Sequence, residues 1–349
     1  MKILFLTPWY PSEKDAMSGL FVHKHAEAVR AQGVDVAVLS AWTWKEFITG
    51  WRHIRRTWGL PDVVQLNVIQ KEGLLALWLK KRYNIPYIIV EHWSGYLPEN
   101  EQFMRLPAWK KRLYQHIAKE CTILLTVSDT LRQAMQQCGI QASRWGRINN
   151  VVDDFFFEPS AVSRQKSDRK TLLHVSCYEE RAKNVKGLLR AAKALSELRQ
   201  DWQLVLVGTG VDYIDVRTYA ESLNFPEGLL KWTGELTPQK VAEAFDNADI
   251  FILPSNYENA PVVLSESIVK GVPIIATRVG GIPEMVNEQC GILVTPGNDN
   301  ELTQTMNHML DHYKEYNHNI ISELGKQYAF SSVGMQLKEI YTHAIETHT

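Results

Sequence analysis

Two carboxylates, Glu258 and Glu266, stand eight residues apart in the stretch SNYENAPVVLSE, residues 255–266. Pro261 between them suits the first turn of a helix, because its missing N–H would have no partner there. The N–H groups that follow could bind an anion such as a phosphate. A nucleotide sugar carries hydroxyls on both sides of its diphosphate, and carboxylates accept hydroxyl hydrogen bonds. The spacing suits such a ligand, although a capping acid followed by a solvated helix glutamate would give the same pattern.

Short apolar strands alternate with helical patterns on both sides of this stretch. Strand–helix repetition of this kind predicts parallel sheets covered on both faces. The predicted helices span 21–32, 72–82, a segment from residue 129, 185–198, 213–223, 238–245 and 261–270. A polar stretch without periodicity, FFFEPSAVSRQKSDRK, separates two sets of elements and is typical of a linker. The predicted fold class is α/β, with two doubly wound parallel-sheet domains.

The pattern divides the 349 residues into four segments. The segments are an N-terminal Rossmann-like acceptor domain at 1–157, a linker at 158–170, a C-terminal donor domain at 171–325, and a helix at 326–349 that crosses back to the N-terminal domain. Ligands of open parallel sheets bind at the carboxyl ends of the strands, so we expect the chemistry in those loops.

Charge and tryptophan are unevenly distributed along the chain. Residues 1–155 hold 20 Lys or Arg and 14 Asp or Glu, a balance of +6, and the remainder holds 18 and 25, a balance of −7. Nine of the eleven Trp also precede residue 156. The uneven distribution indicates that the N-terminal half binds anionic material. Chance variation among solvated charges is an equally good explanation. The four cysteines show no C-x-x-C spacing, which favours a reducing compartment, and the short apolar start MKILFLTPWYP predicts a buried strand rather than a signal peptide.

The run from residue 249 to 284 resembles the E-x7-E signature of retaining glycosyltransferase family 4, the group 1 glycosyl transferases. Its continuation GVPIIATRVGGIPEMV is similar to the family's segment after the signature, and INNVVDDFFF and the glycine loop around MSGLF also resemble family segments. The resemblance spans essentially the whole chain. It implies the GT-B fold, in which two Rossmann-like domains face a cleft and a sugar moves from a nucleotide-sugar donor to an acceptor.

The resemblance also implies roles for individual residues. Glu266 would bind the ribose hydroxyls, and Glu258 the transferred sugar near its C3 and C4 hydroxyls. Lys183, in HVSCYEERAKNVKG, would bind the phosphates. The implied catalytic residues are Glu258, Lys183 and His92. The implied donor-binding residues are Gly19, Arg181, Lys183, Gly234, Glu258, Asn259, Ala260, Pro261, Val262 and Glu266.

Several positions depart from the family pattern or have a plain structural alternative. Cys177 stands where the family has an arginine, and Arg181 is an alternative source of that charge. Asn259 and Ala260 replace the glycine and the bulky residue that the family commonly has there, so the resemblance does not indicate which sugar is transferred. Simple turns would explain Gly19 and Gly234, and a structural histidine would explain His92.

The leading expectation is a retaining, metal-independent hexosyltransferase with a UDP- or GDP-linked sugar as substrate and no cofactor. The acceptor would be a glycan or a lipid-linked molecule of polysaccharide or glycoconjugate biosynthesis. A nucleotide-sugar epimerase and a non-catalytic nucleotide-sugar-binding subunit are the alternatives. VGTGVD lacks the third glycine of a dinucleotide site, and HMLDH lacks the glutamate of a zinc protease, so neither a nicotinamide cofactor nor a metal site is expected. No nucleic acid partner is expected.

The stretch WTWKEFITGWRHIRRTWGL would form a helix with one aromatic stripe, comprising Trp44, Phe47, Ile48, Trp51 and Trp58. Basic residues lie largely off this stripe, and a second basic-aromatic stretch reads FMRLPAWKKRLYQHIAK. Aromatic rings and basic side chains together suit a lipid headgroup boundary. We therefore expect a cytoplasmic enzyme with peripheral contact at the inner face of the membrane; the alternative is that the stripe packs into the N-terminal core.

Overall fold

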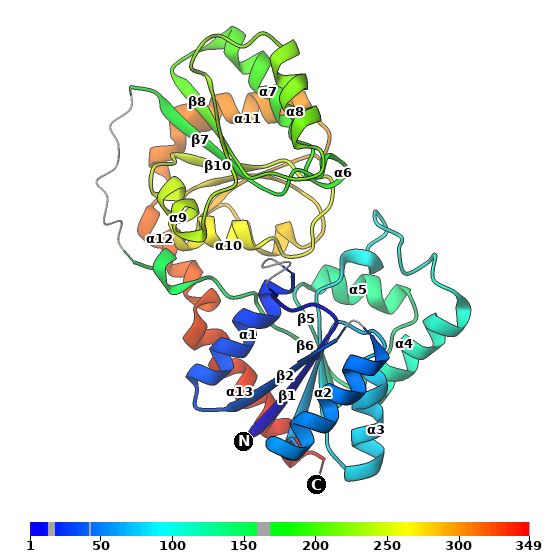
Figure 1. Cartoon of the computed structure of the whole chain (residues 1–349). Coiled ribbons are helices and arrows are strands. Elements are labelled where there is room, and N and C mark those ends of the chain that lie inside the picture. The colour runs from blue at the N-terminus through cyan, green and yellow to red at the C-terminus, as the bar shows by residue number, and fades with distance from the viewer. Residues whose placement is uncertain (13–17, 42, 159–167, 349) are drawn as a thin grey trace. The chain divides into compact units, whose positions relative to one another are not determined.

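The computed structural model describes residues 1–12, 18–41, 43–158 and 168–348 and divides into two compact units. Unit 1 comprises Met1–Val151 with Gln327–Thr349, and unit 2 comprises Val152–Lys326. Each unit holds one six-stranded sheet in which all paired strands are parallel (Figure 1). The predicted α/β class, with two doubly wound parallel sheets, is confirmed.

The sheet of unit 1 has the strand order β2-β1-β3-β4-β5-β6. Its strands are β1 (Lys2–Thr7), β2 (Asp35–Ser40), β3 (Val63–Asn67), β4 (Tyr87–Glu91), β5 (Ile123–Thr126) and β6 (Trp145–Arg147). Its helices are α1 (Leu20–Ala31), α2 (Trp44–Thr57), α3 (Gly73–Tyr83), the 3-10 helix η1 (Ser94–Tyr96), α4 (Ala108–Glu120), α5 (Asp129–Gln137) and α13 (Phe330–Glu346). The central strands β3 and β4 are buried along their whole length, as expected for parallel strands covered on both faces.

The last helix, α13, belongs to unit 1 and lies along α1 (Figure 1). The two helices approach so closely at Gly334 that a Cβ atom there would fall 2.3 Å from the carbonyl oxygen of Ala28. Further along α13, the buried Tyr341 hydroxyl donates to Gln65 Oε1 of β3 at 2.5 Å. The core of unit 1 therefore depends on residues from both ends of the chain.

The boundary between the units falls between Val151 and Val152, earlier than the predicted domain end at residue 157. Packing explains this position, because Phe156 of the 3-10 helix η2 (Asp154–Phe156) is buried with its ring centroid 6.2 Å from that of Phe245 in unit 2. Of the predicted linker, residues 159–167 lie outside the described residues.

The sheet of unit 2 has the strand order β12-β11-β10-β7-β8-β9. Its strands are β7 (Lys170–Val175), β8 (Trp202–Val207), β9 (Leu230–Gly234), β10 (Ile250–Leu253), β11 (Ile274–Thr277) and β12 (Gly291–Val294). Its α-helices are α6 (Glu180–Lys183), α7 (Val185–Leu198), α8 (Tyr213–Ser222), α9 (Pro238–Asp246), α10 (Val262–Val269), α11 (Asp299–His312) and α12 (His318–Leu324). Short 3-10 helices are η3 (Ile282–Glu284), η4 (Tyr313–Glu315) and η5 (Gly325–Tyr328).

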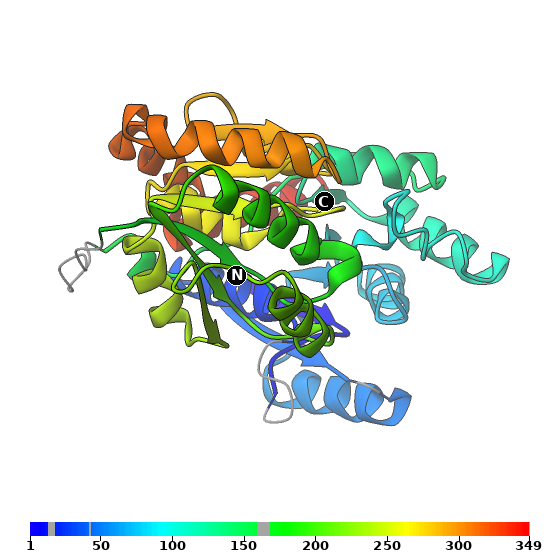
Figure 2. The ribbon, with the colours of Figure 1, turned by 90° about the horizontal axis from the view of Figure 1, so that it is seen from above.

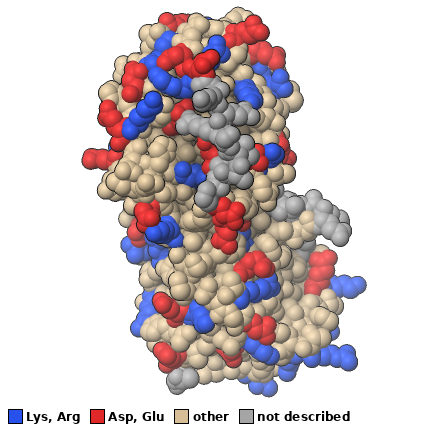
Figure 3. Space-filling model, turned by 90° about the vertical axis from the view of Figure 1, so that its left-hand side faces the viewer, with Lys and Arg blue, Asp and Glu red and all other residues tan. Residues whose placement is uncertain are grey.

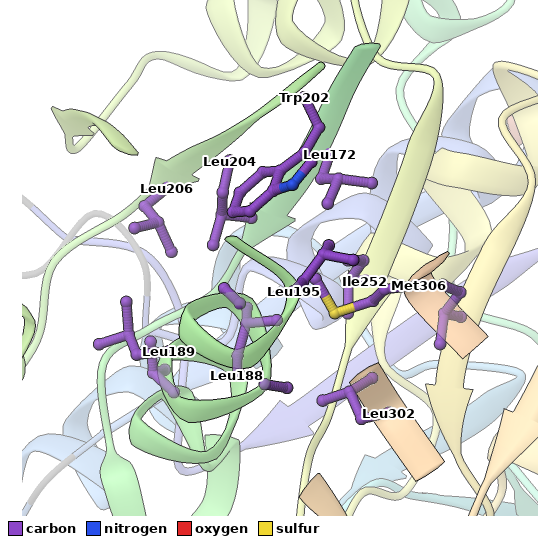
Figure 4. Packing of buried hydrophobic residues seen from close by; sticks show 14 of the residues in the cluster. Leu172, Leu188, Leu189, Leu195, Trp202, Leu204, Leu206, Ile252, Leu302 and Met306 are labelled. Carbon is purple, nitrogen blue, oxygen red and sulfur yellow. The ribbon is translucent and has the colours of Figure 1, made fainter. Parts of the chain in front are cut away.

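Helices cover both faces of this second sheet. Figure 1 shows α7, α8 and α11 on one face and α9, α10 and α12 on the other, and Figure 2 looks onto the first of these faces. The core beneath it joins leucines of α7, including Leu188 and Leu195, to strand residues such as Trp202 and to Met306 of α11 (Figure 4). Burial of large apolar side chains of this kind is the main force that holds the helices on the sheet.

Helix α2 carries the predicted aromatic stripe. It begins with a capping box, in which Thr43 Oγ1 accepts from the Glu46 N–H and the Glu46 carboxylate accepts from the Thr43 N–H. Phe47 and Trp51 are only 5% and 8% exposed, so this part of the stripe packs into unit 1, as the alternative to membrane contact predicted. Trp44 and Ile48 remain 50% and 46% exposed.

Charged side chains of both signs are mixed on the surface. On the face seen in Figure 3, Lys and Arg side chains are interspersed with Asp and Glu, so this face shows no separate basic or acidic region. Within the described ranges, every helix is too short or too polar to cross a membrane.

Candidate active site

Two predicted residues of unit 2, Lys183 and Glu258, lie in segments that follow neighbouring strands. Lys183, at the end of the short helix α6, follows β7, and Glu258 follows β10; Gly280, which was not predicted, follows β11. These three strands are adjacent in the sheet, in the order β11-β10-β7. Because the carboxyl ends of parallel strands share one edge, the topology brings the three loops together.

An ion pair joins two of these loops. Lys183 Nζ lies 2.6 Å from Glu258 Oε1, and the two side chains are only 16% and 9% exposed. Burial by itself would lower the pKa of Lys183, but the negative charge of Glu258, with Cys177 and Glu179 nearby, outweighs burial and raises that pKa. Lys183 is therefore a firmly protonated cation. The structure thus brings together two of the predicted site residues, although their direct ion pair was not predicted.

The loop that carries Glu258 is also fastened to α6. The Asn256 N–H donates to the Ala182 carbonyl at 2.8 Å, and Asn256 Nδ2 donates to the Arg181 carbonyl at 3.0 Å. The guanidinium of Arg181 lies 6.0 Å from the centroid of the Tyr257 ring, within the range of a cation–π contact. Arg181 therefore stands beside the acidic loop, and Cys177, at the family's arginine position, is exposed.

Helix α10 begins at Val262, directly after the residues 259–261. Pro261 is the N-cap residue of this helix. It therefore precedes the helix by one position rather than opening its first turn as predicted. The first N–H groups of a helix lie at the positive end of its dipole and suit an anion. Glu258 precedes this helix start, Glu266 lies about one turn inside the helix and is half-buried, and Asn259 and Ala260 form the turn between.

Three residues that the sequence did not single out support Glu258. Ser255 Oγ donates to Glu258 Oε1 at 2.8 Å, and Thr277 Oγ1 donates to the Ser255 carbonyl at 2.5 Å. Gly280 has a φ of 49°, and a Cβ atom there would fall 1.7 Å from the carbonyl oxygen of Glu258. The glycine pair in TRVGGIPE was a clue to the last of these contacts, because only glycine tolerates both the left-handed conformation and so close an approach.

Gly234 lies at the end of β9, three strands from β10 along the same edge of the sheet. Its φ is 69°, and its carbonyl oxygen accepts the Gly208 N–H at 2.8 Å. The structure therefore places Gly234 at the predicted edge but outside the group of residues around Glu258.

Two predicted residues, Gly19 and His92, belong to unit 1. Gly19 precedes α1 with a φ of 64°, and a Cβ atom there would fall 2.2 Å from the Trp9 carbonyl oxygen, so the close approach requires glycine. The ring of His92 lies 4.1 Å from that of Phe21 and 5.5 Å from that of His25. Burial, with a smaller contribution from His25, lowers the pKa of His92 well below its usual value. His92 is therefore a neutral imidazole at physiological pH.

Glu91, next to His92, was not predicted as a site residue. It is fully buried and accepts three backbone N–H bonds, from Ile69 at 3.0 Å, His92 at 3.0 Å and Trp93 at 2.9 Å. Burial raises its pKa to about 7, although the three donors act in the opposite direction. Glu91 thus fixes the backbone that carries His92.

Comparison with known families identifies the class of protein to which the chain belongs. The family model described as "Glycosyl transferases group 1" matches residues 156–326, and the model described as "Glycosyltransferase Family 4" matches residues 27–154. The chain belongs to the group 1 glycosyltransferases, which confirms the resemblance seen in the sequence.

Among curated proteins, the chain is 24% identical over 302 residues to the MMP alpha-(1->4)-mannosyltransferase of Mycolicibacterium hassiacum, covering 81% of this chain and 71% of that protein. It is also 24% identical over 255 residues to the sulfoquinovosyl transferase SQD2 of Arabidopsis thaliana, covering 68% of this chain. The match spans only 47% of SQD2, so the chain corresponds to about half the length of that relative.

Solved structures show the same fold. Sucrose-phosphate synthase from Thermosynechococcus elongatus has a TM-score of 0.80 at 17% identity, covering 99% of this chain and 100% of that one. Anabaena HepE in complex with UDP has a TM-score of 0.78 at 18% identity, covering 98% and 100%, and HepE is also known in complex with UDP-glucose. The fold is the GT-B fold of these glycosyltransferases.

Proposed function

We propose that the protein transfers a sugar from a UDP- or GDP-linked donor to a glycan or lipid-linked acceptor, with retention of the anomeric configuration and without a metal ion. The observation that carries this proposal is the buried pair of Lys183 and Glu258 beside the start of α10. Membership of the group 1 glycosyltransferases supports the reaction class.

The donor would lie along the loops of unit 2. Its diphosphate would bind the N–H groups at the start of α10 and the ammonium group of Lys183, which is held charged by its acidic neighbours. Glu266 would accept hydrogen bonds from the ribose hydroxyls, and Glu258 from the hydroxyls of the transferred sugar. Arg181 would add positive charge in place of the arginine that Cys177 replaces. That HepE binds UDP and UDP-glucose on the same fold supports this type of donor.

Bond cleavage would depend mainly on stabilising the departing diphosphate. As the bond from the sugar C1 to the phosphate oxygen breaks, negative charge grows on the diphosphate, and a preorganised cation and helix start would stabilise it. The acceptor hydroxyl would form the new bond to C1 on the same face, and its proton would pass to the departing phosphate oxygen. Lys183 and α10 would supply the positive charge that other transferases take from a divalent cation.

A lipid-linked acceptor would also explain the exposed aromatic residues of unit 1. Trp44 and Ile48 of α2 and Trp78 of α3 are 50%, 46% and 43% exposed, and Trp109 of α4 is 65% exposed. The rings of Trp78 and Trp51 lie 6.4 Å apart, so α2 and α3 are neighbours and share one apolar surface. We propose that this surface, with the basic side chains of α2, rests on the inner face of the cell membrane.

The experiment that tests the proposed function has two stages. A thermal-shift screen against UDP-, GDP- and ADP-sugars identifies the donor, because a bound ligand stabilises the folded state by mass action. The stabilising donor is then incubated with the protein, with and without candidate acceptors, and the products are identified. Transfer or slow donor hydrolysis supports the proposal. An epimerised donor would indicate an epimerase, and binding without any turnover would indicate a binding subunit.

A further inference from the structure

Ser255 lies at the carboxyl end of β10, three residues before Glu258. Its side chain is fully buried, and its Oγ donates to Glu258 Oε1 at 2.8 Å. The same oxygen accepts Lys183 Nζ at 2.6 Å. For the other oxygen, Oε2, the described part of the chain provides no hydrogen-bond partner. The two oxygens of one carboxylate therefore have different environments, one held by the protein and one available to a ligand.

The backbone around Ser255 is fixed from a neighbouring strand. Thr277 Oγ1, at the end of β11, donates to the Ser255 carbonyl at 2.5 Å. The loop after β11 then touches the Glu258 carbonyl at Gly280, where no side chain could fit. Because both ends of the segment 255–258 are held against the β11 loop, the Ser255 hydroxyl is a fixed donor rather than a mobile one.

Lys183 is a less permanent partner of Glu258 than Ser255. A diphosphate at the start of α10 carries more negative charge than one carboxylate and would draw the Lys183 ammonium toward itself. The Ser255 hydroxyl is neutral and would not follow. In the donor complex, Ser255 would then be the protein group that still holds Oε1.

We propose that Ser255 is a positioning residue, which keeps Glu258 Oε1 in place so that Oε2 meets the hydroxyls of the transferred sugar when Lys183 turns to the diphosphate. This inference rests on the proposed function of the site. It predicts that loss of the Ser255 hydroxyl disturbs the sugar and not the nucleotide.

The test compares Ser255→Ala with Ser267→Ala. Ser267 is a matched control, because it is a fully buried serine of the same segment of the chain, in α10. Its Oγ donates to the Val272 carbonyl at 2.9 Å, near the C-terminal end of α10 and not to Glu258. The probes are UDP with UDP-glucose or GDP with GDP-mannose, whichever pair stabilises the wild-type protein. For each variant, kcat and KM are measured with the sugar nucleotide, and Kd is measured with the nucleoside diphosphate alone.

We expect Ser255→Ala to lower kcat by about ten- to hundredfold, as for the loss of one hydrogen bond to a charged group. Its affinity for the nucleoside diphosphate should stay within about twofold of the wild type, since that part of the donor does not contact Glu258. Ser267→Ala should change neither kcat nor the affinity for the nucleoside diphosphate. A nearly unchanged nucleotide affinity also shows that unit 2 of the variant is folded.

Two results would overturn the role of Ser255 alone. One is an active wild type with an unchanged kcat in Ser255→Ala, and the other is an equal loss of kcat and of nucleotide affinity, which would indicate a general structural effect. A wild-type protein that turns over no sugar nucleotide would refute the proposed function and the role of Ser255 with it.

Discussion

Lys183 Nζ lies 2.6 Å from Glu258 Oε1, although 75 positions separate the two residues in the chain. Both side chains are largely buried, so replacing either one leaves the charge of the other without its partner. We expect Lys183→Met or Glu258→Gln to lower the free energy of unfolding by roughly 3 kcal/mol each. The double variant should lose clearly less than the sum, because it leaves no buried charge.

Urea denaturation of the full chain measures these losses. The pair of Lys186 and Asp215 is a matched control, because its N–O distance is also 2.6 Å but Asp215 is 65% exposed. Lys186→Met should cost well under about 1 kcal/mol, as for other exposed pairs. Equal losses at the two pairs would argue against a special energetic role for the buried one.

The two acids of the E-x7-E segment should affect different kinetic constants. Glu266→Ala should raise KM for the donor, because Glu266 is proposed to bind the ribose. Glu258→Ala should mainly lower kcat, by about 10²-fold or more, because it is proposed to orient the sugar at the reacting carbon. Steady-state kinetics with the true donor separates these effects, and wild-type constants in both variants would show that the donor lies elsewhere.

Chelation should leave the transfer rate unchanged. The proposed site neutralises the diphosphate with Lys183 and the start of α10, so the rate in EDTA should equal the rate in buffer within error. Wild-type protein is assayed with EDTA, and again after addition of excess Mg²⁺ or Mn²⁺. A rate that falls in EDTA and recovers with either ion would contradict the metal-independent mechanism.

Glu91 should make the stability of unit 1 depend on pH. Burial raises the pKa of this carboxyl to about 7, whereas a glutamate in an unfolded chain titrates at about 4.3. Its stabilising contribution is therefore complete below the unfolded pKa and is lost as the pH rises toward 7. The difference in stability between the wild type and Glu91→Gln should shrink by roughly 2–3 kcal/mol between pH 5 and pH 7.5.

Urea unfolding of both proteins at the two pH values tests this expectation. His25 acts in the opposite direction, because burial lowers its pKa to about 4 and its contribution is lost as the pH falls below about 6.5. Since His25 is present in both proteins, its effect cancels in the difference. A difference that is the same at pH 5 and pH 7.5 would mean that Glu91 titrates normally.

Anionic vesicles should bind the protein at low salt through α2. Co-sedimentation should be strong at low ionic strength and weaker at high ionic strength, because salt screens the basic side chains. Trp44→Ser with Ile48→Ser should abolish it. The matched control is Val211→Ser with Ile214→Ser in unit 2, where the two side chains are 88% and 74% exposed. Wild-type protein that stays in the supernatant, or an equal effect of both double variants, would favour a soluble acceptor.

Local patterns in the sequence predicted the elements well. The helix predicted at 185–198 is α7, and apolar runs such as YIIV and FIL lie in the buried parallel strands β4 and β10, because a run of apolar residues predicts a strand covered on both faces. The order of the strands was not predictable in this way. It depends on how the crossovers place β1 between β2 and β3 and place β7 between β10 and β8, and no short segment specifies that.

The site was predictable where family motifs include the residues, as for Lys183 and Glu258. Ser255 and Thr277 were not found, because their role consists of hydrogen bonds between loops that only the folded sheet brings together. The aromatic stripe of α2 shows the same limit. Helical spacing placed Phe47 and Trp51 on one face with Trp44, but packing against the sheet determined which of them became buried.

The return of α13 to unit 1 has a consequence for biosynthesis. The ribosome completes all of unit 2 before it makes the helix that contacts Ala28 and Gln65, so the first unit of the nascent chain lacks part of its core until α13 has been synthesised. Unit 2, whose residues are contiguous, has every segment available earlier. We therefore expect the second half of the protein to mature first, and a stop codon just before α13 to damage the half of the molecule that was synthesised at the start.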